Sequence, residues 1–88
     1  MVETKVTVIN NAGIHTRPAA IIVKTAAAFK SEVFLSRDGY SVNAKSIIGV
    51  MTLTAEKGAE LILRTEGPDE QKAANNIIAL FEDGFGEI

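Results

Sequence analysis

The 88-residue chain is 47% hydrophobic and 23% charged, a globular composition that excludes a disordered or collagen-like protein. Its length predicts one domain, residues 1–88, and without cysteine it can form neither disulfides nor a thiolate metal site, so we expect a cytoplasmic protein. The net charge of -2 argues against direct nucleic-acid binding, and the alternating start of the chain argues against a signal peptide or membrane insertion.

The first predicted elements are a strand and a helix separated by a polar break. Apolar and polar residues alternate over residues 2–9, as in a half-buried strand, and residues 10–13 interrupt this pattern. Over residues 18–29 the apolar residues have helical spacing, and Pro18 suits a first helical turn, where no N–H is needed. The apolar stripe of this helix comprises Ala19, Ile22, Val23, Ala26 and Ala27.

A hairpin and a short helix are predicted next. Residues 32–36 and 40–43 are rich in β-formers and flank Asp38-Gly39, a dipeptide that favours the positive φ angles of a tight hairpin turn. Ser46 is a favoured N-cap for a short helix that ends near Thr52.

The last part of the chain predicts one more strand and helix. Residues 59–65 alternate as a strand, and Asp69 can cap a helix that Gly84 and Gly86 terminate. The apolar stripe of this helix comprises Ala74, Ile77, Ile78 and Phe81. The order βαββαβα predicts an α+β fold, an open-faced two-layer sandwich with a four-stranded antiparallel sheet and three helices on one face.

The residues that could take part in a chemical reaction lie in and just after the first break, in the segment Gly13-Ile14-His15-Thr16-Arg17-Pro18-Ala19-Ala20. His15 is the only histidine, and taken alone it would most simply be a helix cap or a surface residue. At a helix start, however, the free N–H groups of Thr16 and Arg17 and the helix dipole form an anion site. The same field disfavours the imidazolium form, so we expect a neutral ring that can attack phosphorus.

Arg17 can hold phosphoryl oxygens by charge-assisted hydrogen bonds, although a solvated side chain is its simpler interpretation. The pattern therefore predicts a phosphohistidine site. The sequence has no metal-ligand cluster and no nucleotide-binding loop, so we expect neither a metal nor another cofactor. A chain of this kind would receive a phosphoryl group and pass it on, as a carrier in a relay rather than a stand-alone enzyme.

Two motifs together resemble the HPr phosphocarriers of the bacterial phosphoenolpyruvate-dependent sugar phosphotransferase system. They are Gly13-Ile14-His15-Thr16-Arg17-Pro18-Ala19 and Ser46-Ile47-Ile48-Gly49-Val50-Met51, in the order and separation of that family. The resemblance extends from about Val2 to Gly84. It implies the same open-faced sandwich, with His15 accepting a phosphoryl group on Nδ1 from phosphorylated enzyme I, assisted by Arg17. It also implies transfer to the IIA domains of sugar permeases.

Ser46 is the second residue with an implied role. Most serines so placed are only N-caps, but in many HPr-like proteins the matching serine is phosphorylated by an ATP-dependent HPr kinase/phosphorylase. That modification implies control of carbon-source use, with a carbon-regulating transcription factor as a further partner.

A docking surface is predicted near these motifs. Its basic members are Lys24 and Lys45, and the resemblance implies that they and Arg17 attract an acidic surface of enzyme I. Ile48 is the aliphatic residue expected to be exposed. The i, i+4 spacing of Ile47 and Met51 favours burial, although the resemblance implies that Ile47 and Ile48 touch partners and Met51 belongs to the same run.

Two departures from the family pattern and two alternative functions remain. Ala12 stands where the family often has Ser or Asn, and Thr54 stands where Gly is common. One alternative is a regulatory HPr-like protein, of a nitrogen branch or independent of permeases. The other is a non-catalytic sheet module of the RNA-binding kind, which the few aromatic residues and the negative net charge disfavour.

Overall fold

The elements follow one another in the predicted order. The computed structural model describes residues 1–87, so residue 88 of the predicted domain lies outside the described residues. The elements are β1 (Val2–Thr7), α1 (Thr16–Ala27), β2 (Glu32–Arg37), β3 (Tyr40–Asn43), α2 (Ile47–Met51), β4 (Glu60–Glu66), α3 (Glu70–Glu82) and a 3₁₀ turn, η1 (Gly84–Gly86).

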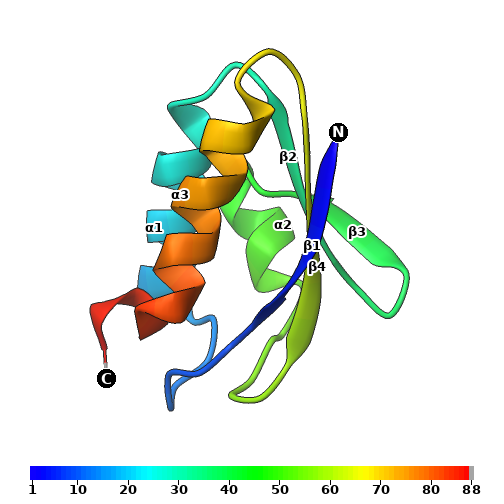
Figure 1. The fold of residues 1–88 in the computed structure, drawn as a ribbon. Helices are drawn as coiled ribbons and strands as arrows, with labels where there is room; N and C mark the ends of the chain where they lie inside the picture. Colours follow the sequence, from blue (N-terminus) through cyan, green and yellow to red (C-terminus); the bar gives the residue numbers. More distant parts are fainter. Residues whose placement is uncertain (88) are drawn as a thin grey trace.

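The four strands form one antiparallel sheet in the order β1-β4-β2-β3. The first strand of the chain therefore pairs with the last, from Val2 opposite Thr65 to Thr7 opposite Glu60. The three helices lie on one side of the sheet and leave its other side open (Figure 1). The predicted open-faced α+β sandwich is confirmed.

The core lies between the sheet and the helices, as strand periodicity requires. In β4, Leu61, Leu63 and Thr65 are buried, whereas Glu60, Ile62 and Glu66 are exposed. Ile77 and Phe81 of α3 are also fully or almost fully buried, so the predicted stripe faces the sheet. Within residues 1–87, no helix is both long enough and apolar enough to cross a lipid bilayer.

The boundaries of β1 and α1 differ from the sequence-based prediction by two residues. β1 ends at Thr7 rather than at residue 9, and α1 begins at Thr16 rather than at Pro18. Proline is tolerated throughout a first turn because the N–H groups there have no helical acceptor, so Pro18 did not mark the start. Ala27, predicted on the buried face, is exposed where the helix ends.

Helix α2 buries fewer apolar residues than its spacing predicted. Ile47 and Met51 are 38% and 40% exposed, so the expectation that they belong to the core is wrong. The helix has only five residues, and Val50 is the one that points into the core. Ile48 is 74% exposed, which confirms its predicted exposure.

Candidate functional site

The loop before α1 is held closely against the segment that precedes β4. The Ile14 backbone N–H donates to the Ala55 carbonyl at 2.8 Å, and the Ile14 side chain is buried. Gly13 has a φ of +70°, and a Cβ on it would lie 2.5 Å from the Ala55 carbonyl oxygen. Only glycine fits there, so the position of the next residues is fixed by backbone contacts.

His15 is the N-cap residue of α1, with extended backbone angles of φ -88° and ψ -166°. Its carbonyl accepts from the Ala19 N–H at 3.0 Å, the first hydrogen bond of the helix. Its side chain makes no capping hydrogen bond and is 43% exposed. The ring is therefore accessible beside the first helical N–H groups, as predicted, and its Nε2 lies 2.8 Å from Oε2 of Glu87.

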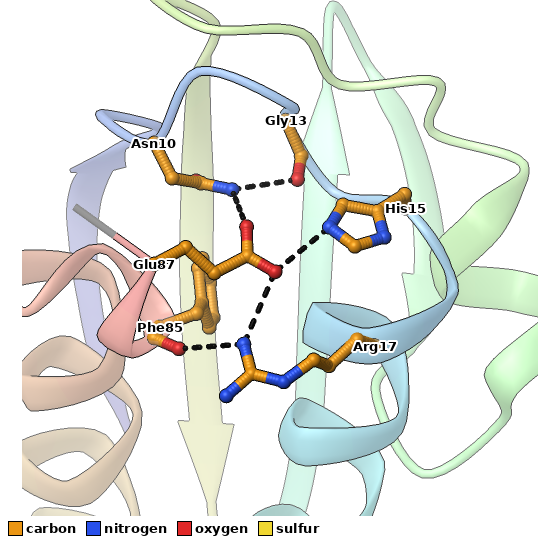
Figure 2. A network of polar contacts seen from close by, with 6 residues as sticks. All are labelled: Asn10, Gly13, His15, Arg17, Phe85 and Glu87. Atoms are coloured by element: carbon orange, nitrogen blue, oxygen red, sulfur yellow. Dashed lines mark hydrogen bonds and ion pairs between the residues drawn. The ribbon is translucent and has the colours of Figure 1, made fainter.

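Arg17 lies one residue inside the helix and points to the same carboxylate. Its Nη1 donates to Oε2 of Glu87 and to the Phe85 carbonyl, each at 3.1 Å. The guanidinium is thus held beside His15 by the segment that follows α3 (Figure 2). Thr16, the first helical residue, is exposed between them.

Asn10 also contacts Glu87, and together with His15 and Arg17 these residues form the His15 cluster. Asn10 is fully buried, and its Nδ2 donates to the Gly13 carbonyl at 2.8 Å and to Oε1 of Glu87 at 2.9 Å. Partial burial raises the pKa of the Glu87 carboxyl, but the hydrogen bonds from Asn10, His15 and Arg17 outweigh it and lower the pKa overall. Glu87 is therefore a carboxylate at neutral pH, with both oxygens bound.

Sequence reasoning missed both Glu87 and Asn10. Glu87 lies 72 residues from His15 in the chain, and an acidic residue after Gly-Phe-Gly carries no local signal for a site. Asn10 was noted only as a strand breaker, whereas full burial of an asparagine requires polar partners. The alternating pattern of residues 2–9 does not indicate that the Asn10 side chain, which follows it, points into the protein.

Ser46 is the N-cap of α2, as predicted. Its Oγ accepts a hydrogen bond from the Gly49 N–H at 3.2 Å, and the residue is exposed. Ile47, Ile48 and Met51 are exposed on the same short helix, which packs against α1.

The two predicted basic docking residues lie at the other end of α1. Lys24 is exposed in its last turn, and nine residues of helix place it about 13 Å along the axis from His15. Lys45 donates through Nζ to the Phe29 carbonyl at 2.8 Å, just after α1 ends. Both lie away from the His15 cluster, and Lys45 has a structural contact as well.

The His15 cluster has the donors of an anion site and not of a metal centre. Within the described residues, 1–87, no group of three or more His, Asp or Glu side chains is arranged to hold a metal ion. The side chains of Arg17 and Asn10 donate to the Glu87 carboxylate, and the first backbone N–H groups of α1 are further donors with no acceptor inside the helix. Such a cluster can bind and exchange anions at an imidazole.

Comparison with known proteins agrees with this geometry. The family described as "PTS HPr component phosphorylation site" matches residues 2–83. The chain is 52% identical over 87 residues to the phosphocarrier protein HPr of Treponema pallidum, covering 99% of both proteins. It is 48% identical over 82 residues to the HPr-like protein Crh of Halalkalibacterium halodurans, covering 93% of this chain and 98% of that protein.

Among solved structures, HPr from Thermoanaerobacter tengcongensis superposes with a TM-score of 0.96 at 41% identity, over 100% of this chain and 99% of that one. Matches of sequence and fold thus extend over almost the whole chain. The chain belongs to the HPr family of phosphocarriers of the phosphotransferase system.

Proposed function

We propose that this chain accepts a phosphoryl group on His15 from phosphorylated enzyme I and donates it to the IIA domains of sugar permeases. The observation that carries the proposal is the exposed His15 ring at the N-cap of α1, beside the Arg17 guanidinium. Family membership supports the phosphotransferase system as the setting, and the accessible ring supports His15 as the acceptor.

The physical argument concerns where a phosphorylated ring would place its charge. The N–H groups of Thr16 and Arg17 begin a 12-residue helix and have no acceptor within it. Together with the helix dipole they stabilise a phosphoryl dianion on the ring. Arg17 can add charge-assisted hydrogen bonds to the phosphoryl oxygens once it releases Glu87.

The test is phosphorylation of the purified chain with enzyme I and phosphoenolpyruvate. We expect an acid-labile mass gain of one phosphoryl group, followed by its loss when a IIA domain is added. The His15→Ala variant should show no gain while its circular dichroism matches the wild type. Absence of labelling in the wild type, or equal labelling of the variant, would contradict the proposal.

A second modification is proposed at Ser46. Its hydroxyl is exposed at the start of α2, on the helix that packs against α1, and three exposed apolar residues follow it. A phosphate there would add about -1.5 to -2 charge beside that apolar surface. We expect HPr kinase/phosphorylase and ATP to phosphorylate the wild type but not Ser46→Ala, and the modified protein to react more slowly with enzyme I.

A regulatory HPr-like function is the alternative candidate, favoured by the similarity to the Crh protein. In that case phosphorylation itself is the output, and Ile47, Ile48, Met51, Lys24 and Lys45 would dock a regulator such as a carbon-regulating transcription factor. The same assay separates the two functions, because a regulatory protein would retain its phosphoryl group when IIA domains are added.

A further inference from the structure

The Glu87 carboxylate contacts three side chains, one from the loop after β1 and two from the start of α1. Oε2 accepts from the Arg17 guanidinium at 3.1 Å and lies 2.8 Å from Nε2 of His15, while Oε1 accepts from the Asn10 amide at 2.9 Å. The side chain is only 18% exposed, and Figure 2 shows it between the ring and the Asn10 amide. The lowered pKa keeps it ionised, so its oxygens can only accept.

This contact determines which ring nitrogen of His15 carries the proton. A neutral imidazole has one N–H and one unprotonated nitrogen, and a hydrogen bond to a carboxylate selects the bound nitrogen as the N–H. In the neutral ring, the contact between Oε2 and Nε2 therefore favours the tautomer with the proton on Nε2 and the free electron pair on Nδ1. Figure 2 shows the second ring nitrogen on the side of the ring away from Glu87.

We propose that Glu87 is a positioning residue that holds His15 in the tautomer whose free electron pair is on Nδ1, the nitrogen that the family resemblance implies is phosphorylated. The inference rests on the proposed carrier function and adds a residue to its site. In the transfer step, the Nδ1 electron pair forms a bond to phosphorus as the bond from phosphorus to the phosphorylated donor breaks, and the electron pair of the broken bond stays on the donor. The Nε2 proton does not move, so the ring gains positive charge, and the Glu87 carboxylate is in contact to stabilise it.

The placement of Glu87 is built into the end of the chain. Gly84, Phe85 and Gly86 all have positive φ angles, 59°, 57° and 72°, which turn the backbone back after α3. The Phe85 ring is buried edge-on against Phe81, with centroids 5.0 Å apart, and its carbonyl accepts from Arg17. The buried Phe85 ring, two positions before Glu87, therefore anchors this segment, and the Phe85 carbonyl joins it to Arg17.

The direct test is the tautomer of His15, measured from the imidazole ¹⁵N chemical shifts at a pH where the ring is neutral. In the wild type we expect the Nε2–H form to dominate. In Glu87→Gln the amide can accept from or donate to Nε2, and a neutral acceptor is weaker than a carboxylate, so the ratio of Nε2–H to Nδ1–H should fall about fivefold. Glu82→Gln, an exposed carboxylate replaced in the same way, should keep the wild-type ratio.

A dominant Nδ1–H form in the wild type, or an unchanged ratio in Glu87→Gln, would overturn the inference. The measurement needs no phosphoryl donor, so its failure is distinct from failure of the carrier function. Where the carrier function holds, Glu87→Gln should also lower the kcat for phosphorylation by a similar factor with little change in KM. A change in KM alone would assign Glu87 to docking instead.

Discussion

Two carboxylates tie the two ends of α1 to the C-terminal third of the chain, with different results. After α1, Asp69 accepts from the backbone N–H groups of Lys30 and Ser31 and from the Ser31 hydroxyl. Before α1, Glu87 binds His15, Arg17 and Asn10. The donors to Asp69 are two backbone N–H groups and a hydroxyl, none of which titrates near neutral pH. The groups that contact Glu87 include an imidazole, which can act as a nucleophile.

A hydrogen-bonded carboxylate stabilises the fold at one end of α1 and contacts the proposed reactive side chain at the other. The Ser31 hydroxyl is the main cause that lowers the pKa of Asp69 from 3.8 to about 2, helped by the two N–H groups. Asp69 therefore fixes where α3 starts relative to the segment after α1. Glu87 instead contacts His15 and Arg17, two side chains that are partly exposed.

The largest expected effect comes from the backbone that carries His15. We expect Gly13→Ala to lower the free energy of unfolding by about 2–4 kcal/mol and to slow phosphorylation, because its Cβ meets the Ala55 carbonyl. Gly39→Ala is the matched control: its φ is also positive, +85°, but nothing lies within 4 Å of the added Cβ. Urea denaturation of both variants measures the difference, and equal losses would contradict the account of the Gly13 contact.

Arg17→Lys should slow phosphotransfer about tenfold in kcat/KM, because a lysine cannot reproduce the planar guanidinium that contacts both Glu87 and the Phe85 carbonyl. Rapid-quench phosphorylation with enzyme I provides the rates. Lys72→Arg, an exposed lysine of α3 outside the site, should retain the wild-type rate. An unchanged rate in Arg17→Lys would remove Arg17 from the transfer machinery.

Replacing each carboxylate by its amide separates the two ends of α1. Asp69→Asn should lower Tm by roughly 5 °C at neutral pH, whereas Glu87→Gln should change it less, since its donors are more exposed. The folded pKa of Asp69 lies below its ordinary value, so its contribution is complete above about pH 4 and is lost as pH falls through about 2.

The pH dependence of melting supplies the check on Asp69. The Tm difference between wild type and Asp69→Asn should shrink between about pH 4 and pH 2, and it should stay constant for Asp83→Asn, an exposed aspartate. A difference that does not vary with pH would argue that Asp69 acts by shape alone.

The smallest effect is expected at Thr54, in the segment that supports the His15 loop. Thr54 has a φ of +46°, a conformation that costs a β-branched residue energy and that glycine adopts freely. Thr54→Gly should therefore raise the free energy of unfolding by about 1 kcal/mol. Thr52→Gly, at a φ of -66°, should lower it, and a loss in both variants would contradict the strain argument.

Local sequence patterns predicted the fold but only half of the site. Alternation and turn residues gave every strand and helix, because each depends on neighbours in the chain, and Asp38 and Gly39 do have the positive φ angles expected of their turn. His15 and Arg17 could be recognised because they lie two residues apart at the start of a helix. Glu87 and Asn10 join them only through the tertiary fold.

The errors have the same origin. Ile47 and Met51 were expected in the core from their spacing, but a five-residue helix presents only Val50 to it. The burial of an apolar residue in a short helix depends on which other elements pack against it. The spacing of residues within that helix carries no information about those elements.

The proposed function requires that His15 accepts the phosphoryl group, and the proposed role of Glu87 requires that it does so through Nδ1. The most direct measurement is NMR of the ¹⁵N-labelled protein after reaction with enzyme I and phosphoenolpyruvate, with the coupling between phosphorus and ring nitrogen identifying the bonded atom. We expect one phosphoryl group, bonded to Nδ1 of His15. A phosphoryl group on Nε2, on another residue, or on none would contradict it.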